Sequence, residues 1–321
     1  MTTIKDVAQH AKVSPATVSR YINNRGYVGT DTRQRIAKAI EELNYVPNEV
    51  ARSLFQKKSK LIGLLLPDIA NPFFPLLAQG VEDYFHQYGY HVILGNIQEN
   101  PDKIAAYLKM FQQNFVAGIL SAVPLNSDEL NKATVIVDRT DCQSTYSISA
   151  NNQQGAQLIV DAITETSYEN IVIIAGPQDV VTANTRFHYV TRALANQGVN
   201  YQVLENTSYR FNNALTTADR LFTEFPQVDT VIAANDVQAI AIIQKAHQLK
   251  RRVPKDLQII GYDDIPMSEL TIPRLTTIQQ PAFAMGWQAA DMLYQLINEE
   301  ELVDKHRLLD VKLITRDTLR K

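Results

Sequence analysis

The chain has 321 residues, of which 45% are hydrophobic, and its formal net charge at pH 7 is −3. This length allows two or three domains with well-buried cores, and the longest apolar runs, such as LIGLLLP (61–67), are too short to span a bilayer. One cysteine, Cys142, excludes an internal disulfide and a cysteine-based metal cluster. The N-terminus lacks a signal-peptide pattern, so we expect a cytoplasmic protein that does not enter the membrane.

The charge is distributed unevenly along the chain. Residues 1–60 carry 11 Lys and Arg against 5 Asp and Glu, a net charge of +6. Residues 61–321 carry 20 Lys and Arg against 29 Asp and Glu, a net charge of −9. A basic head on an acidic body indicates a polyanionic partner for the head, although a solvated basic surface would have the same composition.

The first 46 residues predict three helices. Apolar residues recur at helical spacing over 4–11, and Ser14 followed by Pro15 is a strong start signal for a second helix. A third helix is expected over 30–44, and its core positions are Ile36, Ala37, Ile40 and Leu43. Two short helices joined by a tight turn, with a third packed behind them, form a helix-turn-helix unit.

The second helix has the chemistry of a DNA-recognition helix. Val18 and Ile22 share a face that should point to the core. Arginine can bind guanine bidentately, small methyl groups can contact the thymine methyl, and hydroxyl or amide groups can bind base edges or phosphates. The alternative is a small helical bundle with a polar face. The residues available for DNA are Ala16, Thr17, Arg20 and Asn23 on the opposite face, with Ser19 to the side.

The stretch PNEVARSLFQ (47–56) predicts a very short helix, with Asn48 as its N-cap and Val50 and Leu54 on one face. A helix this short is unstable alone in water, because nucleation costs more than two turns of hydrogen bonds return. It therefore needs a packing partner from outside the segment.

From residue 60 onward, strand-like apolar runs alternate with amphipathic segments of helical length. This pattern predicts parallel sheets covered by helices on both faces, in two α/β lobes with a break near residues 150–155. The runs span 61–68, 91–96, 116–123, 134–139, 170–176, 230–236 and 257–264, and a further strand is expected close to the C-terminus.

Polar residues follow these runs directly. In open α/β sheets ligands bind beyond the carboxyl ends of the strands, so residues at these positions should line a cleft. A sugar requires planar bidentate groups for its hydroxyls and aromatic faces for its C–H surfaces. Residues of both kinds are present; the aromatic ones, Phe73 and Phe74, could equally be core, and Asp236 and Asp264 could be helix caps.

The head resembles the lactose/galactose repressor family over residues 3–54, nearly without interruption. The resemblance is carried by Asp6-Val7-Ala8, Val13-Ser14, Thr17-Val18-Ser19-Arg20, Asn23, Thr32-Arg33, Leu43-Asn44-Tyr45, Pro47-Asn48 and Ala51-Arg52-Ser53-Leu54. It implies a bacterial transcription regulator that binds a near-palindromic double-stranded operator as a homodimer. It also implies that residues 47–56 form a hinge helix, which pairs with its copy in the minor groove and wedges Leu54 between base pairs.

This resemblance implies a helix-turn-helix domain at 1–46, a hinge and linker at 47–59, and an effector-binding and dimerisation body at 60–321 that is similar to periplasmic sugar-binding proteins. The implied DNA-binding residues are Pro15, Ala16, Thr17, Ser19, Arg20, Asn23, Asn48, Ala51, Arg52 and Leu54.

In the body the family pattern implies an effector site for a small sugar. The combination is most similar to a ribose-type site, which favours an unphosphorylated sugar; sites of sucrose or fructose operon repressors look similar, and a sugar phosphate is a further alternative. The sugar would either release the protein from its operator or retain it there. The implied positions are Asn71, Phe73, Phe74, Asp138, Arg139, Arg186, Tyr209, Asn235, Asp263 and Gln280.

Two other classes of protein remain as alternatives. An enzyme is disfavoured because the chain has no dinucleotide, phosphate-loop or nucleophile-elbow motif, and its six histidines show no metal spacing, so we expect neither a cofactor nor a metal. A transport-type sugar-binding protein would lack the DNA-binding head. Relatives that form tetramers add a coiled coil that is not evident here, and some relatives bind a phosphorylated carrier protein as corepressor. We therefore expect a cytoplasmic, nucleoid-associated dimer.

Overall fold

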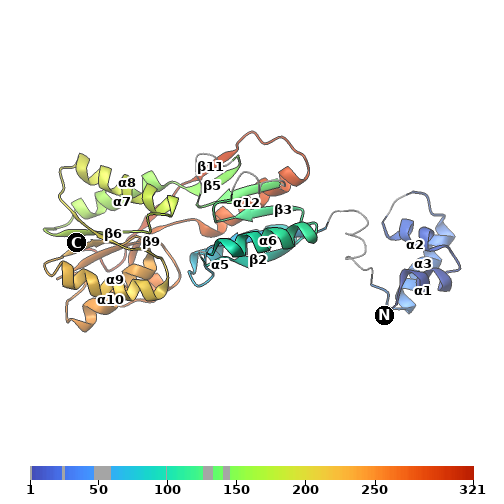
Figure 1. Cartoon of the computed structure of the whole chain (residues 1–321), viewed down its shortest axis with the longest axis horizontal. Helices are drawn as coiled ribbons and strands as arrows, with labels where there is room; N and C mark the ends of the chain where they lie inside the picture. Colours follow the sequence, from blue (N-terminus) through green and yellow to red (C-terminus); the bar gives the residue numbers. More distant parts are fainter. Residues whose placement is uncertain (1, 24–25, 47–58, 99, 126–132, 140–144) are drawn as a thin grey trace. The chain divides into compact units, whose positions relative to one another are not determined.

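The structure of the protein, a computed structural model, describes residues 2–23, 26–46, 59–98, 100–125, 133–139 and 145–321. The chain divides into two compact units, Met1–Ser59 and Lys60–Lys321, which we describe separately (Figure 1). Within the described ranges, no helix combines the length and the apolar character that crossing a membrane requires.

The head is a three-helix unit formed by α1 (Ile4–His10), α2 (Pro15–Ile22) and α3 (Thr30–Glu42). Thr3 and Asp6 form a capping box at the start of α1, and the Ser14 side chain accepts a hydrogen bond from the Thr17 amide at the start of α2. The fully buried side chains of Val7, Val18 and Ile36 join the three helices.

One expected core position of α3 is wrong. Ala37 is exposed, and Ala39 packs against the other two helices instead. The reason is that Ile36, Ala39, Ile40 and Leu43 follow the i, i+3, i+4, i+7 spacing of one helix face, while Ala37 is turned about 100° away from Ile36.

The first lobe of the body is built on a parallel sheet of six strands in the order β11-β5-β4-β3-β1-β2. Because the central strands β1, β3 and β4 are buried on both faces, helices must cover both faces of the sheet. The strands are β1 (Leu61–Leu66), β2 (His91–Asn96), β3 (Gly118–Ser121), β4 (Ala133–Val137), β5 (Ser147–Ala150) and β11 (His306–Leu309).

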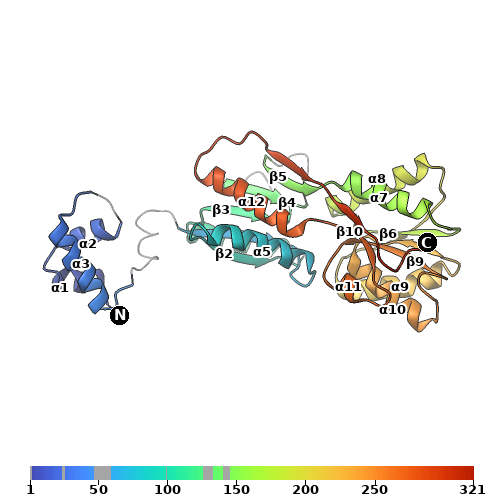
Figure 2. The same cartoon turned by 180° about the vertical axis from the view of Figure 1, so that it is seen from behind.

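Three helices cover the first sheet. Leu64 and Leu66 of β1 pack in one core with α5 (Phe73–His86) and α12 (Ala282–Ile297). Leu65, which points to the other face, packs with Phe111 of α6 (Pro101–Gln113). Figure 2 shows α12, far from α5 in the sequence, lying in this lobe among the strands and helix of the first half of the chain.

The second lobe has a six-stranded sheet in the order β12-β10-β9-β8-β6-β7, in which only the β10–β12 pair is antiparallel. Its strands are β6 (Ile171–Ala175), β7 (Gln202–Glu205), β8 (Thr230–Ile232), β9 (Gln258–Asp263), β10 (Thr276–Gln279) and β12 (Lys312–Ile314). Figure 1 shows α7 (Asn152–Thr164) and α8 (Val181–Asn196) on one face of this sheet, and α9 (Phe211–Glu224) and α10 (Asp236–Gln248) on the other. The short helix α11 (Met267–Leu270) follows β9.

The chain passes between the lobes three times: between β5 and α7, between β10 and α12, and between β11 and β12. Each lobe is therefore completed by a segment from the other half of the sequence. Four strands were not predicted, namely β5 (SISA), β7 (QVLE), β10 (TTIQ) and β11 (HRLL). Each has four residues, of which at least two are polar, so periodicity alone gives too weak a signal.

Candidate functional site

A polar cavity of about 300 Å³ lies at the carboxyl ends of the strands, between the two lobes. The structure brings all ten predicted effector positions into its wall and adds one residue, Thr182. The first lobe supplies Asn71, Phe73, Phe74, Asp138 and Arg139, the second supplies Thr182, Arg186, Tyr209, Asn235 and Asp263, and Gln280 follows β10 at the second passage between the lobes.

The first-lobe wall combines two aromatic rings with a charged pair. Phe73 and Phe74 meet edge to face with ring centroids 5.1 Å apart, and both belong to the hydrophobic core as well as to the cavity. Asp138 follows β4 with a φ of +63°, and the guanidinium of Arg139 lies 5.7 Å from the Phe74 ring centre. The Asn71 carbonyl oxygen Oδ1 accepts a hydrogen bond from the Phe73 amide, which fixes the start of α5.

Arg186 is the central cation of the cavity. Its guanidinium lies 3.7 Å from a carboxylate oxygen of Asp138 in the first lobe and 3.7 Å from one of Asp263 in the second. Its Nε donates to Oδ1 of Asn152 at 2.8 Å, and its fork lies over the Tyr262 ring at 4.1 Å. Packing and hydrogen bonding therefore hold this fork in place across the gap between the lobes.

The two carboxyl groups beside Arg186 share one cation inside a buried site. Burial raises the pKa of Asp138, and burial raises the pKa of Asp263 to about 8; Arg186 opposes both shifts. Oδ1 of Asp263 accepts from Nε2 of Gln280 at 2.6 Å, while Oε1 of Gln280 is buried with no partner among the described residues. A ligand hydroxyl is the kind of donor that would satisfy this oxygen.

Asn235 and Asp236 have different positions. Asn235 lines the cavity and is also the N-cap of α10, since its Oδ1 accepts from the Gln238 amide. Asp236 is fully buried and accepts hydrogen bonds from the Ile265 amide, Ser268 and Thr277. It ties α10 to the segment after β9 and lies outside the cavity wall.

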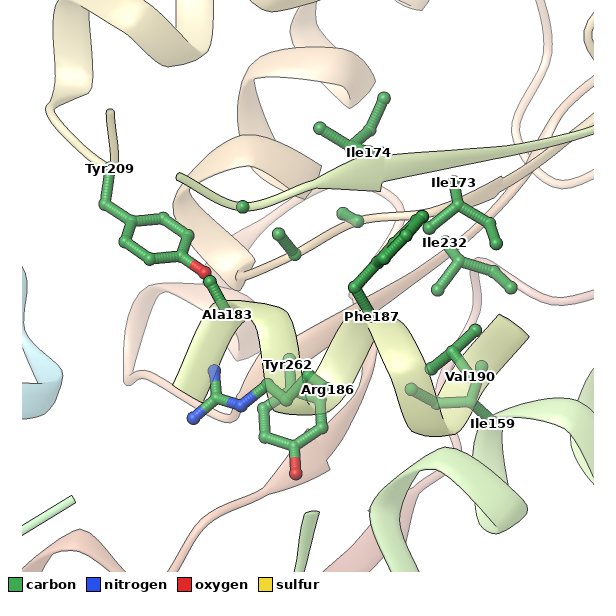
Figure 3. A pocket seen from close by; sticks show the side chains of 13 residues that line it. Ile159, Ile173, Ile174, Ala183, Arg186, Phe187, Val190, Tyr209, Ile232 and Tyr262 are labelled. Carbon is green, nitrogen blue, oxygen red and sulfur yellow. The ribbon is translucent and has the colours of Figure 1, made fainter. Parts of the chain in front are cut away.

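A second cavity, which is apolar and has a volume of about 350 Å³, lies inside the second lobe (Figure 3). Arg186 and Tyr209 line both cavities, while Ile173, Phe187 and Val190 belong to the inner one alone. Figure 3 shows the Tyr209 hydroxyl directed toward Ala183 on α8. The Tyr209 ring and the Arg186 fork therefore separate the polar cavity from an apolar interior.

In the head, Pro15, Ala16 and Arg20 of α2 are exposed, and Thr17 and Ser19 are half-buried. Asn23 differs from the expected outward placement. It ends α2, and its Nδ2 donates to the carbonyl oxygen of Ser19 at 2.8 Å, so its amide is folded back onto the helix. The predicted hinge residues Asn48, Ala51, Arg52 and Leu54 lie outside the described residues.

Comparison with known proteins agrees with this two-part architecture. Residues 3–48 match the bacterial regulatory proteins of the lacI family, and residues 160–319 match the periplasmic binding protein-like domain. The ribose operon repressor of Bacillus subtilis (strain 168) is 45% identical over 325 residues, which cover 100% of this chain and 99% of that relative. The chain belongs to the lacI family of bacterial regulatory proteins.

Two further proteins are similar to this chain over nearly its whole length. The ribose operon repressor of Lactococcus lactis subsp. lactis (strain IL1403) is 39% identical over 100% of the chain and 98% of the relative. A crystal structure of the lac repressor dimer, bound to operator and the anti-inducer ONPF, is 26% identical, with a TM-score of 0.88 and 99% of both chains covered. The predicted family and fold class are confirmed.

Three residues that support the site were not predicted. Thr182 on α8 lines the cavity, and Asn152 and Tyr262 hold Arg186 from behind. The Tyr262 hydroxyl donates to the same Asn152 oxygen at 3.1 Å, and Gly155 leaves room for it, since a Cβ there would lie 2.6 Å from that hydroxyl. Only Thr182 had a signal in the sequence, because it lies one helical turn before Arg186.

The buried carboxyl groups of this lacI-family protein predict a pH dependence of its stability. Burial raises the pKa of Asp236 to about 7 and that of Asp263 to about 8, from an ordinary value of 3.8. Between about pH 4 and pH 8 the folded protein then holds protons that the unfolded chain has released, so these two groups make stability fall as the pH rises.

The variant Asp263→Asn should remove part of this loss of stability with rising pH. The melting temperature of the variant minus that of the unmodified protein should therefore be higher at pH 8 than at pH 5. The control is Asp310→Asn at an exposed aspartate. Thermal melting of the three proteins at both pH values measures the effect. If Asp263→Asn and the unmodified protein differ in melting temperature by the same amount at pH 5 and pH 8, Asp263 does not cause the pH dependence.

Proposed function

We propose that this protein represses a ribose-utilisation operon and that ribose, bound in the polar cavity between the lobes, releases it from operator DNA. The cavity itself carries the proposal: it combines three aromatic rings, a fixed arginine fork, two carboxyl groups and three amides. These groups suit the C–H faces and vicinal hydroxyls of a small neutral sugar. The names of the two relatives, which are both ribose operon repressors, support ribose as that sugar.

The proposed release depends on the position of the site between the lobes. Arg186 of the second lobe faces Asp138 of the first at 3.7 Å, so a ligand that inserts between them changes how the lobes are held together. A ligand can shift an equilibrium between two arrangements only by its difference in affinity for them. We infer that ribose favours the arrangement of a homodimer in which the hinge segments cannot pair on DNA.

For the head we propose that Arg20 and Thr17 read bases, that Pro15, Ala16 and Ser19 contact the duplex edge or phosphates, and that Asn23 orients the end of α2. The exposure of Arg20 and the half-burial of Thr17 support this division. Asn48, Ala51, Arg52 and Leu54 remain proposed hinge contacts, with Leu54 as the wedge in the minor groove. The site of action would be the cytoplasm, on the nucleoid, where operator DNA lies.

The proposal is tested by fluorescence anisotropy with the full-length protein and a labelled duplex enriched by repeated selection for binding to it. Ribose should weaken DNA binding at least about tenfold, which is a usual size for coupling between two sites, and DNA should weaken ribose binding by the same factor. Sucrose and fructose, which are the alternative sugars, should have little effect.

If none of these sugars alters DNA affinity, the proposal that the protein senses a sugar fails. If ribose tightens DNA binding, the protein senses ribose, but the proposed release from DNA is wrong. The proposal requires no protein corepressor. A phosphorylated carrier protein becomes a proposed partner only if it changes DNA affinity where ribose alone does not.

A further inference from the structure

A third cavity of about 330 Å³ adjoins the effector cavity, and we call it the entrance chamber. The two cavities share four wall residues, including the Phe74 and Tyr209 rings, so one ligand can extend from one into the other. The wall of the entrance chamber consists of Pro67, Asp68, Asn71, Phe74, Gln98, Arg139, Tyr209 and Arg210.

Arg210 is positioned over this chamber by a contact between the lobes. It precedes α9 in the second lobe, and its Nη2 donates to the backbone carbonyl oxygen of Gln98 in the first lobe at 2.7 Å. Lys103 approaches the same residue from α6, with its Nζ 2.7 Å from Oε1 of Gln98. Two cations from opposite lobes therefore meet at Gln98, although Arg210 is itself exposed to solvent.

The wall of the chamber includes a further guanidinium, that of Arg139. Arg139 lines both cavities, and its guanidinium lies 5.7 Å from the centre of the Phe74 ring, which also lines both. The only carboxylate among the wall residues is Asp68, whose Oδ1 accepts a hydrogen bond from the Ala70 amide at 3.0 Å. The chamber wall is therefore cationic, with Lys103 adding to its charge.

The effector cavity has no such excess of cationic side chains. Its two carboxyl groups, Asp138 and Asp263, face Arg186 and Arg139, and its remaining groups are neutral. A ligand that suits both spaces has a neutral polyhydroxyl ring at one end and an anion at the other. Arginine forks match the oxygens of a phosphate group geometrically as well as electrostatically.

We propose that the entrance chamber binds a phosphate group beside the sugar ring held in the effector cavity, so that a phosphorylated pentose is bound more tightly than the free pentose. This inference rests on the proposed sugar site and identifies the class of its preferred ligand. A second, neutral sugar ring between Phe74 and Tyr209 is the competing occupant, and the measurements below separate the two.

Isothermal titration calorimetry of the full-length protein with ribose, with ribose 5-phosphate, and with ribose in the presence of inorganic phosphate tests the chamber. Ribose 5-phosphate should bind about tenfold more tightly than ribose at low ionic strength, as expected for charge-assisted hydrogen bonds at a partly exposed site. The preference should shrink as salt is added. Inorganic phosphate should leave ribose affinity unchanged, because a free anion in the chamber adds no bond to the neutral sugar.

The variant Arg210→Gln should reduce the preference for ribose 5-phosphate over ribose to about twofold or less, because the screened charge at the chamber is lost. The loss of the Gln98 contact weakens both ligands alike, so the ratio of the two affinities is the informative quantity. Arg210→Lys should retain most of the preference. The control is Arg220→Gln on α9, since Arg220 also donates to a backbone carbonyl, that of Glu205, but lies outside both cavities.

Equal affinities for ribose and ribose 5-phosphate, or a preference that survives unchanged in Arg210→Gln, would overturn the phosphate chamber. Tighter binding of a neutral disaccharide than of ribose 5-phosphate would overturn it in favour of a second sugar ring. If neither ribose nor its phosphate binds, the sugar site itself fails, and this result is distinct from either of the others.

Discussion

Replacing Arg186 by alanine should weaken ribose binding by more than about 100-fold, because a buried fork that serves several polar groups is lost and charge-assisted hydrogen bonds contribute about 1.5–3 kcal/mol each. The side chain is only 13% exposed and lies within 3.7 Å of carboxylate oxygens from both lobes. DNA binding by the head should persist, so the variant should remain on its operator at ribose concentrations that release the unmodified protein.

The control is Arg192→Ala, which removes an exposed arginine from the same helix. Calorimetry with ribose and anisotropy with labelled operator measure the two functions separately. The loss of Arg186 leaves Asp138 and Asp263 without their shared cation, but burial already raises the pKa of both carboxyl groups, so they can take up protons rather than remain charged. If the Arg186→Ala protein left its operator at the same ribose concentration as the unmodified protein, the Arg186 fork would not be part of the sensor.

The variant Gly80→Val should destabilise the first lobe severely. Gly80 on α5 and Gly286 on α12 let the two helices approach until backbone meets backbone. A Cβ at Gly80 would lie 2.1 Å from the carbonyl oxygen of Phe283, and one at Gly286 would lie 2.0 Å from that of Leu77. Neither carbonyl can move without shifting its helix, so we expect a loss of at least about 3 kcal/mol.

A loss of this size lowers the melting temperature by roughly 10 °C in a domain of this length. The control is Gln79→Val, which places the same β-branched side chain at an exposed position of α5 and costs only about 0.5 kcal/mol in helix propensity. Thermal melting of the full-length proteins compares them. A melting temperature of Gly80→Val within 2–3 °C of the control corresponds to roughly 1 kcal/mol. This result would show that α5 and α12 can move apart without a large loss of stability.

The alternation of apolar runs and amphipathic segments was sufficient to predict the two-lobed α/β body, because buried parallel strands must be apolar on both faces. The same pattern led to the cavity. Polar residues that directly follow such strands gather at one edge of the sheet, and all ten positions chosen on this basis and on the family resemblance line one space.

Other features were decided by tertiary contacts. At least half of the residues in the short strands β5, β7, β10 and β11 are polar, and these segments become strands only because a neighbour in the sheet satisfies their backbone groups. Asn152 and Tyr262 are separated by 110 positions and meet only because α7 and β9 converge behind Arg186. No local pattern marks them, since their role is a contact between distant segments.

The amino-acid sequence by itself thus determined the family, the helix-turn-helix head, the two lobes and ten residues of the cavity wall. These features depend on hydrophobic periodicity, on helix start signals and on positions relative to strand ends, which are all local properties of the sequence. Only the tertiary structure decided how Arg186 is held, how Gly80 and Gly286 bring α5 against α12, and how Arg210 reaches Gln98 at the entrance chamber beside the effector cavity. Each of these depends on segments far apart in the chain, and the chain passes between the lobes three times to bring them together.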